Sequence, residues 1–158
     1  MKVPFNYLPF QFKDHAPYFK EWKKLIKSCE FTLGPFVKKF EKSFANYVGS
    51  KYCYSTNNGT DALILSLKAI GIKNGDEVIT VCNSFYATTG AIVACGAKPI
   101  FVDCDERYQI NVSQIDSVVT KKTKAILPVH WGGASPDMNI IMKIAKKYKL
   151  KVVEDACM

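Results

Sequence analysis

The sequence predicts an α/β fold, with a parallel-rich sheet covered by helices on both faces. Three observations support this fold class. Strand-like and helix-like segments alternate from residue 51 to residue 156. The strand-like segments are short and nearly continuous in apolar residues, as expected for parallel strands buried on both faces. Glycine, proline and capping residues separate the segments, so each one has a recognisable start or end.

The N-terminal part is expected to form a separate arm. Residues 1–20 are rich in proline and aromatic residues, which predicts an extended segment, and a helix is expected from Pro17 to about Cys29 because apolar residues recur there at helical spacing. The stretch "FTLGP", residues 31–35, interrupts the helical pattern. We therefore divide the chain into an arm with a first helix, residues 1–34, and a sheet domain, residues 35–158. The second domain opens with a helix from Pro35 to Val48.

Five strands and four further helices are expected after that helix. The strands are predicted at residues 51–56, 76–82, 98–105, 123–130 and 151–156. The helices are predicted at residues 61–71, 85–96, 111–120 and 135–150, the third of them begun by Asn111. Ligands of parallel sheets bind beyond the carboxyl ends of the strands, so the residues that follow each strand are the candidates for a site.

Composition excludes several classes of function. The 22 Lys and Arg against 14 Asp and Glu give a net charge of +8, but the cations are spread along the chain, so we expect no nucleic-acid binding. No apolar run approaches the ~20 residues of a membrane span, so no membrane association is expected. Six cysteines without a CxxC pair indicate a reduced, cytoplasmic protein. With two histidines in the sequence, His15 and His130, no histidine-based metal site is expected.

A polar turn opens the helix predicted at residues 61–71. In "STNNGTDAL", residues 55–63, Thr60 or Asp61 as an N-cap explains the polar residues. The same turn also offers unpaired N–H groups and the positive end of a helix dipole to a phosphate. From these residues alone both interpretations stay open. The turn has one glycine and no following lysine, which argues against a dinucleotide fingerprint and a nucleotide P-loop.

Three other residues follow predicted strands and also allow two interpretations each. Asp155 ends the apolar segment "LKVVEDA" and either reaches solvent or faces a cationic ring nitrogen. Phe85 either packs in the core or stacks on a flat heteroaromatic ligand. His130 either makes a structural hydrogen bond or contacts a cofactor or substrate.

The order of several short motifs resembles a known family. NGTDAL, GDEVI, SFYAT, GAKPIFVD, PVHWGG and VVEDA follow one another between residues 58 and 156. Each motif alone is weak, but their order and spacing together resemble the DegT/DnrJ/StrS family of sugar aminotransferases that use pyridoxal phosphate (PLP). The resemblance runs from about Pro4 to Cys157. It implies part of the PLP-binding large domain of fold-type I transferases for residues 35–158.

The resemblance also implies roles for individual residues. Gly59, Thr60 and Asp61 match a cradle for the cofactor phosphate, Phe85 matches an aromatic ring that stacks on the pyridine, and Asp155 matches the partner of the pyridine nitrogen. A protonated nitrogen makes the ring an electron sink. We expect Thr32, in the "FTLGP" segment, and His130 to lie near the substrate. The family also implies a homodimer in which "FTLGP" approaches the partner's cofactor.

The chain also departs from the family pattern. After "EDA" the family continues with Gln or His, whereas this chain has Cys157 and ends at Met158. No lysine matches the position that binds the cofactor covalently, so no catalytic residue is assigned and the chain is expected to be a truncated, inactive part of the enzyme. The implied reaction transfers an amino group, with glutamate as expected donor, to a nucleotide-linked keto sugar. Alternatives are sugar dehydration, in which histidine replaces the lysine, or a non-catalytic remnant that binds a phosphorylated ligand or partner.

Overall fold

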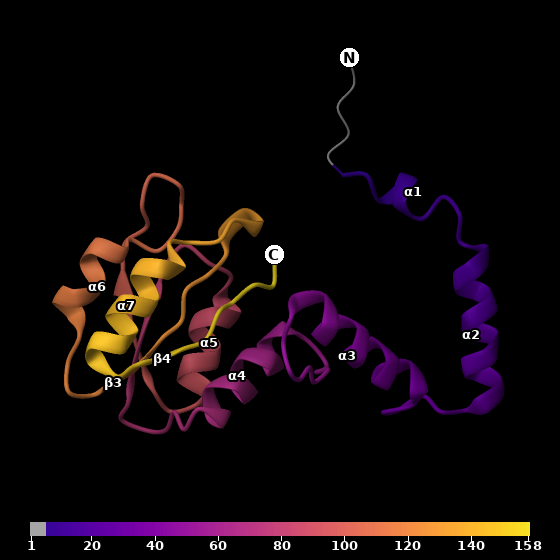
Figure 1. Ribbon diagram of the computed structural model, residues 1–158, viewed down its shortest axis with the longest axis horizontal. Coiled ribbons are helices and arrows are strands. Elements are labelled where there is room, and N and C mark those ends of the chain that lie inside the picture. Colours follow the sequence, from indigo (N-terminus) through magenta and orange to yellow (C-terminus); the bar gives the residue numbers. More distant parts are fainter. Residues whose placement is uncertain (1–5) are drawn as a thin grey trace, which may run out of the picture. The chain divides into compact units, whose positions relative to one another are not determined.

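The computed structural model describes residues 6–158, which form two compact units, the first ending at Ser55 and the second running from Thr56 to Met158. The first unit contains α1 (Leu8–Gln11), α2 (Ala16–Ser28) and α3 (Pro35–Val48) (Figure 1). The predicted helices are confirmed, the first within one residue and the second at both ends. Pro35 starts α3, where a missing N–H costs nothing, and Gly49 ends it in the left-handed region at φ 71°.

The expectation of an extended arm over residues 1–20 is wrong for part of that segment. Residues 8–11 form α1, and α2 already begins at Ala16. Residues 1–5 lie outside the described part of the chain. The proposed division after residue 34 stays a prediction.

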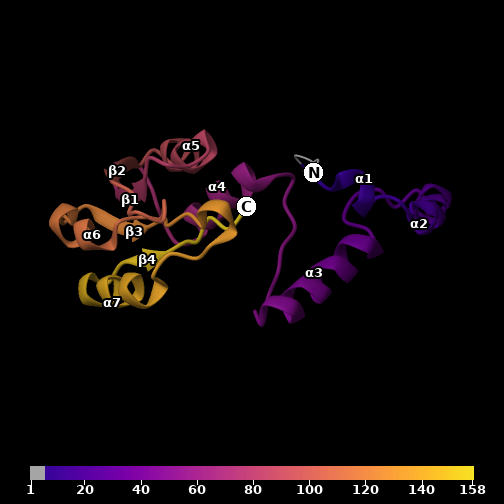
Figure 2. The same cartoon turned by 90° about the horizontal axis from the view of Figure 1, so that it is seen from above.

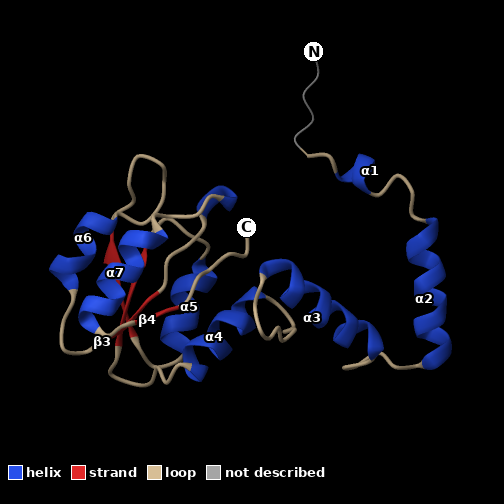
Figure 3. Cartoon of the chain, in the orientation of Figure 1, coloured by secondary structure: helices blue, strands red, loops and turns tan. Residues whose placement is uncertain are grey.

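The second unit is built on a parallel sheet. Its elements are α4 (Gly59–Ala69), β1 (Glu77–Val81), α5 (Tyr86–Ala94), β2 (Lys98–Val102), α6 (Val112–Val118), β3 (Thr123–Ile126), the short 3-10 turn η1 (Trp131–Gly133), α7 (Met138–Tyr148) and β4 (Lys151–Val152). The four strands, red in Figure 3, pair in the order β2-β1-β3-β4, and every neighbouring pair is parallel. The prediction of a parallel α/β sheet is confirmed.

Two apolar cores lie on opposite faces of the sheet (Figure 2). On one face Val78 of β1 and Ala125 of β3 pack with Leu67 of α4 and Ile92 of α5. The next residue along each strand, Ile79 or Ile126, points to the other face and packs with α6 and α7. Because successive strand residues face opposite sides, both faces need apolar residues, which explains the continuous apolar runs.

The structure corrects two local expectations. Residues 51–56, expected as a strand, make no strand pairing within the described chain, since no neighbouring strand supplies their ladder bonds. The N-cap of α4 is Asn58 and not Thr60 or Asp61. Asn58 Oδ1 accepts a 2.8 Å hydrogen bond from the Asp61 N–H. An N-cap side chain reaches the N–H of the third helical residue, which here is Asp61.

Within residues 6–158, none of the helices is both long enough and apolar enough to cross a bilayer.

Candidate functional site

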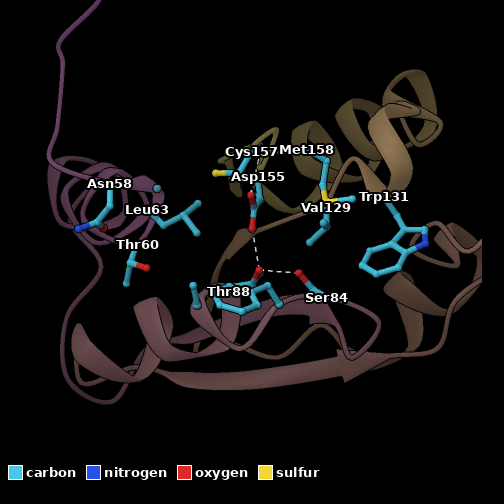
Figure 4. Close-up of a pocket in the computed structure, with 13 residues that line it drawn as sticks. Asn58, Thr60, Leu63, Ser84, Thr88, Val129, Trp131, Asp155, Cys157 and Met158 are labelled. Carbon is cyan, nitrogen blue, oxygen red and sulfur yellow. Dashed lines mark hydrogen bonds between the residues drawn. The ribbon is translucent and has the colours of Figure 1, made fainter. Parts of the chain in front are cut away.

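A cleft of ≈ 390 Å³ opens at the carboxyl-end edge of the sheet, within the second unit (Figure 4). It is lined by Asn58, Gly59, Thr60, Leu63, Ser84, Phe85, Ala87, Thr88, Val129, Trp131, Asp155, Cys157 and Met158. These residues come from the start of α4, the β1–α5 turn and the segments that follow β3 and β4. The volume is that of a site for a small cofactor, since such pockets span about 300–1,000 Å³.

The start of α4 presents free backbone donors to this cleft. Gly59 and Thr60 are the first two helical residues, and their N–H groups find no acceptor within the described chain. The third amide, that of Asp61, is already bonded to Asn58 Oδ1. The expected cradle of three residues is therefore reduced to two open amides and the Thr60 side chain, at the positive end of the helix dipole.

Asp61 is occupied by this cap. Its carboxylate accepts a 3.1 Å hydrogen bond from the Asn58 side-chain amide, and Asp61 does not line the cleft. The pair Asn58–Asp61 therefore closes the first turn of the helix in both directions. Asn58, which the sequence analysis did not single out, takes the place in the cleft wall expected for Asp61.

Asp155 is held rigidly at the end of β4. Its N–H donates to Pro128 O and its carbonyl accepts from the His130 N–H, both at 2.9 Å, and it forms an isolated parallel bridge with Val129. The residue is 6% exposed, so the solvent-exposed interpretation is excluded. None of the ion pairs found within residues 6–158 includes Asp155. A buried carboxylate without a cation is costly, and it makes this wall suited to a cationic N–H group.

Two hydroxyl groups connect Asp155 to the β1–α5 turn. Thr88 Oγ1 donates to Asp155 Oδ2 at 2.6 Å, and Ser84 Oγ lies 2.6 Å from Thr88 Oγ1 (Figure 4). Thr88 is fully buried. Neither hydroxyl was identified from the sequence, since Ser84 precedes the N-cap Phe85 and Thr88 lies within α5.

Phe85 is the N-cap of α5 and is exposed over 64% of its surface. The core-packing interpretation is therefore wrong, because the ring lies at the cleft wall and not in either apolar core. Its centroid is 4.1 Å from that of Tyr86, with the two rings tilted by 47°. An exposed ring at a cleft wall provides a flat apolar surface for a ligand.

Trp131 forms the far wall of the cleft and is fixed by Gln109. The Trp131 carbonyl accepts a 3.0 Å hydrogen bond from Gln109 Nε2, and the Trp131 N–H donates to Gln109 Oε1 at 3.3 Å. Gln109 is 2% exposed. One buried amide thus satisfies both backbone groups of Trp131 and holds η1, where Gly132 and Gly133 adopt positive φ.

Cys157 lies between Asp155 and the start of α4. Burial raises the pKa of the Cys157 thiol, and the negative charge of the nearby Asp155 carboxylate raises it further. The raised pKa lowers the fraction of reactive thiolate at a given pH.

Besides Asp61, His130 is absent from the cleft lining, and Thr32 belongs to the first unit. His130 Nε2 is 2.9 Å from Glu154 Oε2, and the residue does not line the cleft, so the structural hydrogen bond is the role the geometry supports. Thr32 is exposed in the bend between α2 and α3 of the first unit. Four expected residues do share the cleft, namely Gly59, Thr60, Phe85 and Asp155.

Comparison with known proteins identifies relatives over most of the chain. The 3-oxo-glucose-6-phosphate:glutamate aminotransferase of Bacillus subtilis is 44% identical over 85% of this chain and 31% of its own length. The dTDP-3-amino-3,6-dideoxy-alpha-D-galactopyranose transaminase of Aneurinibacillus thermoaerophilus is 46% identical over 84% of this chain and 37% of its own length. The chain therefore spans about a third of the length of these two relatives.

Solved structures confirm the fold. The crystal structure of NtdA from B. subtilis with bound cofactor PMP matches 99% of this chain and 37% of its own, with a TM-score of 0.92 and 40% identity. S. venezuelae DesV in complex with a ketimine intermediate matches 98% of this chain and 42% of its own, with a TM-score of 0.94 and 33% identity. The sequence model of the DegT/DnrJ/EryC1/StrS aminotransferase family matches residues 14–158 of this chain. From its sequence and its fold, the chain belongs to the DegT/DnrJ/EryC1/StrS aminotransferase family.

Proposed function

We propose that this chain supplies the PLP-binding cleft of an enzyme that transfers an amino group from glutamate to a nucleotide-linked keto sugar. The observation that carries the proposal is Asp155, a buried carboxylate without a cationic partner among the described residues, in one cleft with two open helix amides. The names of the relatives, a glutamate aminotransferase and a dTDP-sugar transaminase, support the donor and the acceptor.

The cleft residues fit the chemical groups of PLP. The open amides of Gly59 and Thr60 and the Thr60 hydroxyl would hold the phosphate, because an anion is stabilised at a helix N-terminus. Phe85 would cover the ring, and Asp155 would accept a hydrogen bond from the ring N–H. When bound, PLP supplies an electron sink for the carbanion formed in amino-group transfer.

The contribution of Asp155 is electrostatic. An opposite charge at 4 Å is worth about 4 kcal/mol at an effective dielectric constant of 20, before desolvation is subtracted. Asp155 is already desolvated by the fold, so a cationic N–H that binds there recovers interaction energy that the free protein lacks. Asp155 would therefore hold a proton at the ring nitrogen, and Phe85 and Trp131 would shield the two walls from water once the cleft is filled.

The described cleft offers no side-chain amine that could bind the cofactor covalently. None of its lining residues is a lysine. We therefore propose that the 158-residue chain, by itself, binds PLP but does not turn over substrate. Sugar dehydration and binding without catalysis stay alternative predictions, because no residue of the cleft distinguishes them from amino transfer.

The first unit supports the proposal of a homodimer. Its helices expose several aromatic side chains, and an apolar groove in this unit is lined by Pro17, Tyr18, Phe19, Glu21, Trp22, Leu25 and Phe36. Apolar surface of this kind is typical of a subunit interface.

We place the protein in the cytoplasm, since all six cysteines are unpaired.

A binding experiment tests the proposal. The sequence has two tryptophans, and Trp22→Phe leaves Trp131, in the cleft wall, as the only reporter. We expect PLP to quench Trp131 fluorescence saturably, inorganic phosphate to compete, and Asp155→Asn to weaken binding. Quenching that does not saturate, or that Asp155→Asn leaves unchanged, would contradict a cofactor role for this cleft.

A further inference from the structure

We propose that Thr88 is the residue that orients the Asp155 carboxylate toward a cationic ligand, with Ser84 as the outer end of a directional hydroxyl relay. This inference rests on the proposed function, since the ligand is the ring nitrogen of PLP. It assigns a role in selecting the charge of the ligand to Ser84, in the β1–α5 turn, and to Thr88, in the first part of α5. Thr88 is a positioning residue, because it acts through Asp155.

The hydrogen-bond directions in the relay are fixed by chemistry. An ionised carboxylate only accepts hydrogen bonds, so the single hydroxyl proton of Thr88 is donated to Asp155 Oδ2, at 2.6 Å. Thr88 Oγ1 has then no proton left for Ser84. The 2.6 Å contact between the two hydroxyls must therefore run from Ser84 to Thr88. Each bond polarises the next in the same direction, which strengthens the donor that Asp155 receives.

The two carboxylate oxygens of Asp155 have different roles in the relay. Oδ2 receives the short bond from Thr88, whereas the hydrogen bond found for Oδ1 within residues 6–158 is a long one, 3.4 Å from the Cys157 N–H. Oδ1 therefore keeps most of its capacity to accept a hydrogen bond. Holding Oδ2 fixes the rotation of the carboxylate, and thereby fixes where Oδ1 is offered.

Burial makes the relay more than a surface contact. Thr88 is 0% exposed and Asp155 is 6% exposed, so water does not replace the bond between them. The two residues are 67 positions apart and belong to α5 and to the end of β4. Phe85 stands between Ser84 and Thr88, so one turn carries both the ring surface and the hydroxyls that orient Asp155.

The test compares two ligands that differ at one atom. PLP carries the ring nitrogen, and its 1-deaza analogue has a CH group in that place with the same phosphate and shape. We define selectivity as the ratio of their dissociation constants, measured by Trp131 quenching in the Trp22→Phe background. If Thr88 had only a structural role, replacing it would weaken the binding of both ligands equally and leave this ratio unchanged.

Three variants separate the parts of the relay. Thr88→Val keeps the shape and removes the hydroxyl, and it is expected to lower the selectivity about 10- to 100-fold, as for the loss of a hydrogen bond to a charged group. Thr88→Ser retains a hydroxyl and is expected to keep the selectivity. Ser84→Ala removes only the outer bond and is expected to lower the selectivity by about 2- to 10-fold. Thermal melts establish that each variant is folded.

Each outcome decides between the proposals. If the unmodified chain binds neither ligand, both the proposed function and the relay are wrong. If it binds PLP selectively and the folded Thr88→Val variant is equally selective, the relay alone is wrong. Should Thr88→Val fail to fold, Ser84→Ala still decides, because an unchanged selectivity in that variant would overturn the relay.

Discussion

Cys157 approaches Gly59 so closely that a Cβ atom added to Gly59 would lie 2.8 Å from the Cys157 sulfur. The contact joins the first helical residue of α4 to the segment after β4, the two ends of the cleft wall. A side chain at residue 59 therefore requires the Cys157 thiol to move, whereas the backbone conformation of Gly59 is one that any residue can adopt.

The first prediction follows from this contact. Gly59→Ala should lower the free energy of unfolding by about 1 kcal/mol, at the low end of overpacking costs, because the thiol has to move. Cys157→Ala removes the sulfur and should restore the stability of the double variant. Urea unfolding of the four proteins measures the coupling. Strictly additive effects would show that the two residues do not press on each other.

A second prediction concerns the reactivity of Cys157. Its pKa is raised by burial and by the Asp155 carboxylate, so at pH 8 less of it is thiolate than for an unperturbed thiol. Alkylation by iodoacetamide should therefore be slow and should accelerate only at higher pH. Asp155→Asn removes the charge and should speed the reaction at pH 8, whereas added PLP should slow it. Mass spectrometry of the peptide gives the rate, with the exposed Cys29 as internal reference.

The third prediction uses two helix caps as a matched pair. Asn58 caps α4 at the cleft, and Asn111 caps α6 by accepting from the Ser113 N–H, without lining the cleft. Replacing either by alanine should cost about 0.5–2 kcal/mol of stability. Only Asn58→Ala should also weaken PLP binding, because the loss of the cap loosens the first turn of α4, which carries the open amides. Equal loss of affinity in both variants would mean that the effect is one of stability alone.

The fourth prediction tests how Gln109 fixes Trp131. Gln109→Leu leaves the Trp131 N–H without its acceptor, while the Trp131 carbonyl keeps its bond from the Ala134 N–H, and the change should cost about 1–3 kcal/mol. The emission of Trp131 should also change, since η1 loses its anchor. Gln114→Leu is the control, because Gln114 Oε1 accepts from the Asp103 N–H elsewhere in the unit. A Trp131 spectrum that is the same in both variants would contradict the anchoring role.

A fifth prediction concerns turnover. With PLP, glutamate and a keto sugar nucleotide, the 158-residue chain should form no 2-oxoglutarate, because no lysine lines the described cleft. Its exposed aromatic residues should make it associate, which light scattering detects. Turnover by a monodisperse sample would contradict the inference that the chain lacks a group needed for catalysis.

Local signals predicted most of the fold. Asn111 and Pro35 mark the starts of helices because each acts on the residues next to it, and both predictions are confirmed. The cap of α4 was misplaced because several residues of the turn are capping types, and only the backbone geometry selects Asn58. Residues 51–56 have strand-like composition, but a strand also requires a neighbour, which the sequence of the segment does not contain.

The cleft could be predicted only in part. Gly59, Thr60, Phe85 and Asp155 were expected together because each follows a predicted strand, and they share the cleft although residues 51–56 form no strand. Thr88 was missed because its bond to Asp155 joins residues 67 positions apart, and a threonine within an apolar helix has no local mark of such a contact. Trp131 was missed for a similar reason, since it is Gln109, 22 positions away, that fixes its backbone.

The β-bridge between Val129 and Asp155 orders one wall of the cleft before a ligand binds. The conformational entropy lost on binding therefore comes from the other wall. Asp155 is tied by its backbone to the sheet and by its carboxylate to Thr88, so a ligand finds this group already ordered. Phe85 and Met158, by contrast, are 64% and 70% exposed and have to be immobilised when the cleft fills. Each such side chain costs about 0.5–1.5 kcal/mol to order. The aromatic wall, and not the charged one, is therefore where a stiffer side chain would tighten binding.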